Sequence, residues 1–73
     1  MEFKNIGEFD NFVVSCTEEK DFEEIMKDDL FLNNKALQIN FVNNPLAPEE
    51  LVGKLYMITK FNEVKQIIQK RMI

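Results

Sequence analysis

The sequence predicts a small α+β domain in which two or three short strands pack against two or three amphipathic helices. Apolar and polar residues alternate over residues 35–42, as they do in a half-buried strand, whereas apolar residues recur with a helical period over 17–30 and 61–72. The chain has 73 residues with only two glycines and two prolines. We therefore expect residues 1–73 to form one compact domain without a linker.

Two segments in the N-terminal part of the chain, residues 1–6 and 11–16, can each be interpreted in two ways. Residues 1–6 alternate weakly, so we expect them to be either disordered or an additional edge strand. Three adjacent apolar residues favour a buried strand over residues 11–16. A helix is the alternative there, because apolar residues from Phe9 to Cys16 also recur with the spacing i, i+3, i+4, i+7.

The next predicted element is a helix over residues 17–30. Phe22, Ile25 and Met26 form its apolar stripe, and the Thr17 hydroxyl can cap its N-terminus. Acidic residues occupy its first turn, where the helix dipole favours negative charge.

Residues 35–42 give the clearest predicted strand. Leu37, Ile39 and Phe41 share one face of an extended chain, and the polar residues between them share the other face. Turn-forming residues follow at 43–45. Whether this strand runs parallel or antiparallel to the strand at 11–16 is not determined by the sequence.

Two helices are predicted for the remainder of the chain, over residues 48–59 and 61–72. Pro48 suits a first helical position. If the apolar stripe of the helix at 48–59 is continued at the helical period, Val64 does not lie on it. We therefore expect a break near residues 59–61. The alternative places a third strand at 54–60.

The chain lacks the side chains that most catalytic and metal sites require. It has no histidine, its one serine (Ser15) therefore has no imidazole partner, and Cys16 is the single cysteine. Gly7 and Gly53 are isolated, so no glycine-rich phosphate loop is present. We therefore expect no enzymatic activity, no cofactor, no metal site and no internal disulfide.

Acidic residues are concentrated in the first half of the chain. Residues 1–31 contain ten acidic residues and three lysines, for a local net charge of −7, whereas the whole chain carries −4. On the helix at 17–30 several carboxylates point away from the apolar stripe and can dock on a basic surface. Alternatively, Lys20 and Lys27 neutralise part of this strip through i,i+4 ion pairs with glutamates.

Seven residues are predicted to bind a partner: five in the acidic strip and two aromatic residues expected to reach the surface. They are Glu19, Asp21, Glu23, Glu24, Asp28, Phe31 and Tyr56.

The leading functional hypothesis is a small non-enzymatic regulator or inhibitor that docks its anionic helix face on another protein with a basic surface. The alternative is a self-associating structural or accessory module, such as a homodimer, because the apolar content is high for so short a chain. Nucleic-acid binding through the basic C-terminal segment is disfavoured by the net negative charge.

Composition also indicates where such a protein would work. No segment is apolar enough to cross a bilayer, and the N-terminus lacks the layout of a signal peptide, so we expect a cytoplasmic protein without a membrane partner. The abundance of Lys, Asn, Ile and Phe suits an AT-rich bacterial or phage genome.

Overall fold

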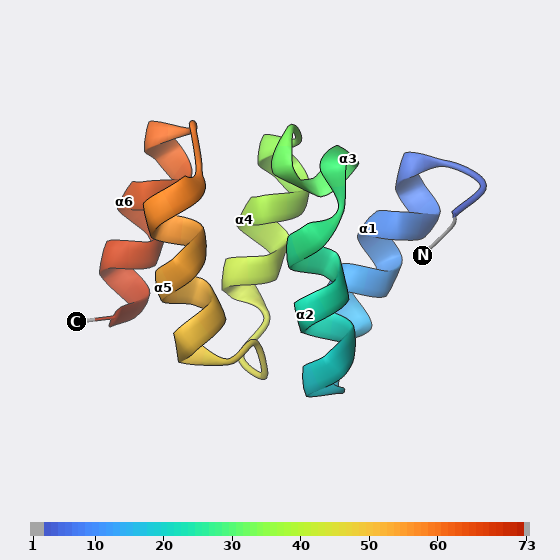
Figure 1. Cartoon of the computed structure of the whole chain (residues 1–73), viewed down its shortest axis with the longest axis horizontal. Coiled ribbons are helices and arrows are strands. Elements are labelled where there is room, and N and C mark those ends of the chain that lie inside the picture. Colours follow the sequence, from blue (N-terminus) through green and yellow to red (C-terminus); the bar gives the residue numbers. More distant parts are fainter. Residues whose placement is uncertain (1–2, 73) are drawn as a thin grey trace.

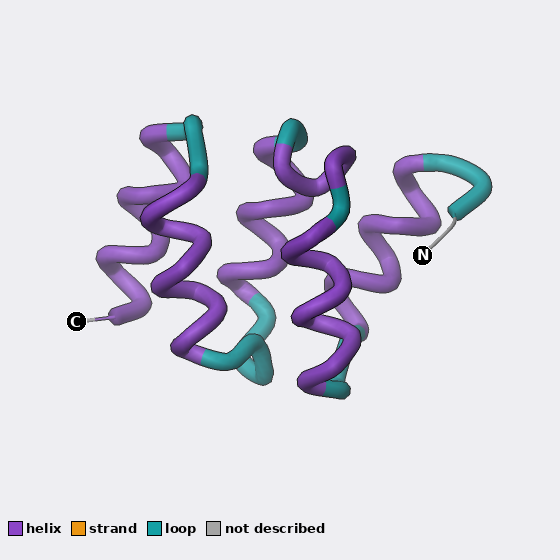
Figure 2. Tube along the Cα trace, viewed as in Figure 1, coloured by secondary structure: helices purple, strands orange, loops and turns teal. Residues whose placement is uncertain are grey.

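The computed structural model describes residues 3–72, and all regular structure within that range is helical (Figures 1 and 2). The predicted α+β class is therefore wrong, because no strand forms in the described part of the chain. The helices are α1 (Ile6–Ser15), α2 (Glu19–Lys27), α3 (Asp29–Leu32), α4 (Lys35–Asn43), α5 (Glu49–Ile58) and α6 (Asn62–Met72).

The helices form two layers that enclose one apolar core. In Figure 1, α1, α4 and α6 lie side by side and run in the same direction, while α2 and α5 cover them and run the opposite way. The short helix α3 continues from α2 and packs against α4. The core therefore lies between the layers, where the aromatic rings of Phe22 and Phe31 contact that of Phe41.

The strand predicted at 11–16 is the second half of α1, so the helical alternative is the correct one. The Asn5 side chain accepts a hydrogen bond from the Glu8 amide and caps the N-terminus of this helix. Phe9 and Val13, one helical turn apart, are buried. The predicted edge strand at 1–6 lies partly outside the described residues, and its described part leads irregularly into α1.

The strand predicted at 35–42 is α4, the central helix of its layer. Leu37 and Phe41 are buried at the i,i+4 spacing, but Gln38 and Val42 are buried as well, because neighbours cover this helix on several sides. When a helix is buried over so much of its circumference, its apolar residues no longer recur with a clear helical period. The alternation of apolar and polar residues then suggested a strand, although the polar Gln38 lies in the core.

The single helix predicted over 17–30 is divided at Asp28. This residue adopts an extended backbone conformation (φ −80°, ψ 128°), and its carboxylate accepts a hydrogen bond from the Leu30 amide at 2.9 Å. Asp28 thus ends α2 and caps α3, and the change of direction turns the Phe31 ring into the core. The predicted Thr17 cap is wrong, because the N-cap position of α2 is Glu18.

The two C-terminal helices and the break between them are confirmed. Thr59 ends α5 in an extended conformation, and its hydroxyl oxygen accepts a hydrogen bond from the Phe61 amide at 3.2 Å. The alternative strand at 54–60 is wrong, since α5 continues to Ile58.

Side chains from neighbouring elements satisfy the carbonyl groups at the C-terminal ends of α1 and α4. The Asn44 amide donates to the carbonyl oxygens of Val13 (2.9 Å) and Cys16 (3.0 Å) at the end of α1. The Arg71 guanidinium, in the last turn of α6, donates to the carbonyls of Val42 (2.7 Å) and Asn44 (2.9 Å) at the end of α4. Each helix of the first layer is thereby tied to the next one.

A second set of buried polar contacts lies at the opposite end of the molecule. The Gln38 amide donates to the carbonyls of Phe31 (2.9 Å) and Leu32 (3.1 Å), which end α3, and its carbonyl oxygen accepts from the Thr59 hydroxyl. Gln38 therefore connects α3 and α4 to the end of α5. No buried side-chain nitrogen or oxygen within residues 3–72 lacks a hydrogen-bond partner.

We expect Asn44→Ala to lower the free energy of unfolding by about 2 kcal/mol, because it leaves buried carbonyls of α1 without donors. Urea unfolding followed by circular dichroism measures this loss. Asn43→Ala is the matched control: Asn43 is the preceding residue of the chain but is exposed, and its replacement should change stability by less than about 0.5 kcal/mol. Equal effects of the two substitutions would contradict a structural role for the Asn44 amide.

Candidate functional site

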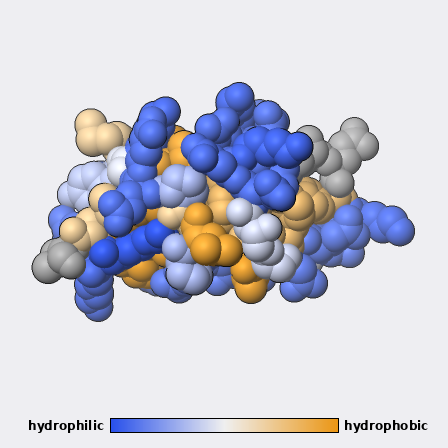
Figure 3. Space-filling view, turned by 90° about the horizontal axis from the view of Figure 1, so that it is seen from below, coloured by the Kyte–Doolittle hydropathy of each residue, from blue (hydrophilic) through white to orange (hydrophobic). Residues whose placement is uncertain are grey.

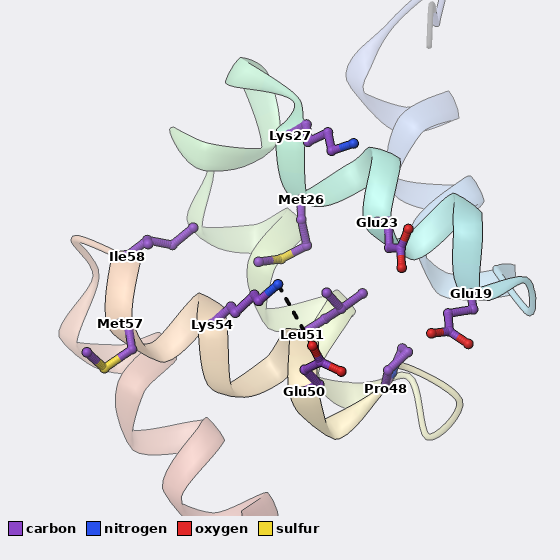
Figure 4. A pocket seen from close by; sticks show the side chains of 10 residues that line it. All are labelled: Glu19, Glu23, Met26, Lys27, Pro48, Glu50, Leu51, Lys54, Met57 and Ile58. Atoms are coloured by element: carbon purple, nitrogen blue, oxygen red, sulfur yellow. Dashed lines mark ion pairs between the residues drawn. The ribbon is translucent and has the colours of Figure 1, made fainter.

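A groove of about 520 Å³ lies between α2 and α5, the two parallel helices of the second layer (Figure 4). Met26 from α2 and Leu51, Met57 and Ile58 from α5 provide its apolar lining. Met57 is 81% exposed and Ile58 is 55% exposed, whereas Met26 is half-buried and Leu51 belongs to the core. A groove with uncovered large apolar side chains is a common site for binding another molecule.

Five charged side chains line this groove, and three of them are carboxylates. Glu19 and Glu50 lie in the first turns of α2 and α5, Glu23 lies midway along α2, and Lys27 lies in the last turn of α2 (Figure 4). Lys54, halfway along α5, lies 3.9 Å from the Glu50 carboxylate. The result is an acidic end and an opposite end dominated by apolar side chains.

The acidic end of the groove has a local physical cause. Acidic residues in the first turn and basic residues in the last turn stabilise a helix through its dipole. Both α2 and α5 begin with acidic residues. Because the two helices run parallel, their acidic first turns lie at the same end of the groove.

The five residues of the predicted acidic strip have different surroundings in the structure. Glu19 and Glu23 line the groove, and their part in binding a partner stays a prediction. Glu24 is exposed, and its carboxylate lies 4.0 Å from Lys27, so the i,i+4 pairing of Lys27 with Glu23 is replaced by an i,i+3 pair. Asp21 is half-buried, and Asp28 is engaged in capping α3.

The two aromatic residues predicted to reach the surface do not form part of the groove. The prediction is wrong for Phe31, whose side chain is fully buried. Tyr56 is half-buried on the side of α5 that faces α6, where its hydroxyl accepts a hydrogen bond from the Gln69 amide at 3.1 Å. Met57, which is 81% exposed, is instead the most exposed of the large apolar side chains that line the groove.

A second hollow, beside α6, is occupied in part by structural contacts. It is lined by Val42, Ile67, Lys70 and Arg71, among other residues. Because the Arg71 guanidinium donates to backbone carbonyls, its donors are engaged within the fold. This hollow therefore offers a weaker binding surface than the groove between α2 and α5.

Cys16 follows α1 and is buried, with its thiol 3.8 Å from the Glu18 carbonyl oxygen. Burial raises the pKa of the Cys16 thiol, the backbone contact with Glu18 lowers it, and the nearby Asp21 and Glu18 carboxylates raise it further. The net shift is upward, so this thiol stays protonated at neutral pH and is a poor nucleophile.

Comparison with known proteins assigns no family to this chain: no family model, curated protein or solved structure matches it. Within residues 3–72, no three His, Cys, Asp or Glu side chains are grouped closely enough to hold a metal ion. None of the described helices has the length and apolar character needed to cross a membrane.

We expect the Cys16 thiol of the folded chain to react with iodoacetamide at least about tenfold more slowly at pH 8 than the same thiol in urea. The reason is that burial and the raised pKa both deplete the accessible thiolate. Mass spectrometry of the alkylated chain over time measures the two rates. Equal rates would show that the thiol is exposed and reactive.

The raised pKa of the Cys16 thiol also makes the free energy of unfolding depend on pH. The folded chain holds the thiol proton more tightly than the unfolded chain, so the free energy of unfolding falls as pH rises from the ordinary thiol pKa toward the raised one. Cys16→Ala should remove this part of the decline, as measured by urea unfolding at several alkaline pH values.

Proposed function

We propose that this chain is a small, non-enzymatic protein-binding regulator or inhibitor that docks the acidic face of α2 on a basic region of another protein. The observation that supports this most strongly is the position of Glu19 and Glu23 at the rim of a groove with exposed apolar side chains. Carboxylates steer a basic partner toward the surface, and the apolar side chains beside them gain free energy when they are covered.

The ion pairs of the groove leave these carboxylates available to a partner. Among residues 3–72, neither Glu19 nor Glu23 takes part in an ion pair. The two pairs nearest to them, Lys27–Glu24 and Lys54–Glu50, are solvent-exposed and long. Such pairs contribute at most about 1 kcal/mol, so rearranging them on binding costs little.

Self-association is the second candidate function, and a different surface supports it. Figure 3 shows the end of the molecule where α1 leads into α2 and α4 leads into α5, with apolar side chains at the surface among polar ones. Val14, in the last turn of α1, and Leu46, between α4 and α5, are each 57% exposed. No sheet edge is available for self-association, because the described residues form no sheet.

The basic residues of the C-terminal half are largely engaged within the fold, which weighs against nucleic-acid binding. Arg71 donates to backbone carbonyls, Lys60 donates to the Asn33 side chain at 2.9 Å, and Lys54 pairs with Glu50 at 3.9 Å. A nucleic-acid surface requires a concentrated set of cations that are free to contact phosphates.

Reversing the charge of the α2 face should abolish binding to a basic partner. The test variant is E19K/E23K/E24K, which leaves the Asp28 cap intact. The control variant is E8K/D29K/E63K, which makes the same change in net charge on α1, α3 and α6. Proteins captured by the immobilised wild-type chain from a bacterial lysate are identified, purified and measured against all three forms over a range of salt concentrations.

We expect the test variant to bind at least about tenfold more weakly at low salt, and the difference to shrink as ionic strength rises. The control variant should bind like the wild type, because its acidic residues lie outside the groove. Equal weakening by both variants would show only a net-charge effect. Unchanged binding by the test variant would rule out docking through α2.

A further inference from the structure

The groove between α2 and α5 has the length and lining of a site for one helix. The ten residues of α5 span about 15 Å, which corresponds to about three helical turns. Apolar side chains are present along this length, from Leu51 in the first half of α5 to Met57 and Ile58 at its end, with Met26 opposite them. Methionine side chains adapt readily to the apolar face of a helix.

The charges of the groove also define a direction for its occupant. Glu19 and Glu50 lie at one end, and Glu23 follows Glu19 along α2, so basic residues of the occupant are favoured in this part of the groove. Basic residues stabilise a helix in its last turn, not in its first. A helix that places Lys or Arg opposite these glutamates therefore meets them most favourably with its C-terminal end.

The helix dipoles favour the same direction. The N-terminal ends of α2 and α5, both located at the acidic end, carry positive partial charge. The C-terminal end of an occupying helix carries negative partial charge. An occupant antiparallel to α2 and α5 thus places opposite dipole ends together, as the two layers of this fold already do.

We infer that the groove binds an amphipathic helix of the partner protein, about three turns long, antiparallel to α2 and α5, with Lys or Arg residues in its last turn. The apolar face of this helix covers Met26, Leu51, Met57 and Ile58, and its basic turn lies against Glu19 and Glu23. This inference rests on the proposed protein-binding function and specifies the chemistry and direction of the segment that is bound.

Three labelled peptides of about 14 residues test this inference by fluorescence anisotropy. The first carries a leucine stripe at i, i+3, i+4, i+7 with three lysines in its last turn and glutamine and alanine elsewhere. The second has the same composition and stripe, but its three lysines are in the first turn. The third keeps the C-terminal lysines and scrambles the stripe.

We expect the first peptide to bind the wild-type chain about tenfold more tightly than the second, and the third to bind more weakly than either. The E19Q/E23Q/E50Q variant should bind the first two peptides with nearly equal affinity, because it removes the three carboxylates that line the groove. A preference that persists in this variant would reflect the helicity of the free peptides and would overturn the proposed direction. The absence of binding up to high micromolar concentration would overturn the inference as a whole.

Two alanine variants test whether the peptide binds at the groove or at other exposed apolar residues. M57A/I58A should lower the affinity for the first peptide about tenfold. It leaves the fold intact, because both side chains are exposed. V14A/L46A is the matched control, since it truncates two exposed apolar side chains that do not line the groove. Equal affinity of M57A/I58A and the wild type would place the peptide elsewhere.

Sedimentation of the chain alone tests whether a second copy occupies the groove. The inference requires that the groove be free in the isolated chain, so a dimer that is abolished by M57A/I58A would overturn it. Different results would contradict the inference and the proposed function. Unchanged peptide binding by M57A/I58A removes the helix-binding groove, whereas unchanged partner capture by E19K/E23K/E24K removes the docking function itself.

Discussion

The fold depends on supplying hydrogen-bond donors to helix C-termini that lie side by side. The parallel arrangement of α1, α4 and α6 brings the unpaired carbonyl groups and the negative dipole ends of neighbouring helices together. The amide of Asn44 and the guanidinium of Arg71 provide the compensating donors, each reaching from one helix or its cap to the end of the helix beside it. Arg71 also brings a positive charge to a site where the dipoles favour one. Without these two side chains, the parallel layer would bury carbonyls that neither water nor protein satisfies.

The surface of the second layer follows from this arrangement. Because α1, α4 and α6 are parallel and the connections between elements are short, α2 and α5 must both return in the opposite direction and are therefore parallel to each other. Acidic first turns are an ordinary means of stabilising individual helices. When two such helices lie in parallel, the same local preference produces a groove with one acidic end. The charge pattern of the candidate site is thus a consequence of helix stabilisation combined with topology.

The errors of sequence interpretation in α4 and α1 have separate causes. In α4, Gln38 is buried and makes hydrogen bonds that end α3, so a polar residue stands at a core position and the apolar pattern appears to alternate. In α1, a run of adjacent apolar residues suggested a strand, although the spacing of Phe9 and Val13 was also compatible with the helix that forms. By contrast, the apolar residues of α5 and α6 recur with a helical period, and these helices and the break between them were predicted correctly.

The sequence alone determined the local features: the acidic first turns, the positions of the C-terminal helices, the absence of histidine, and the choice of Glu19 and Glu23 as surface carboxylates. These follow from the spacing and chemistry of nearby residues. The tertiary structure decided that Phe31 is buried, that Asp28 caps a new helix, and that Met57 lies exposed in the same groove as Glu19 and Glu23. The reason is that α2 and α5 are separated by more than twenty residues, and no pattern within either helix specifies that they run parallel and share a groove.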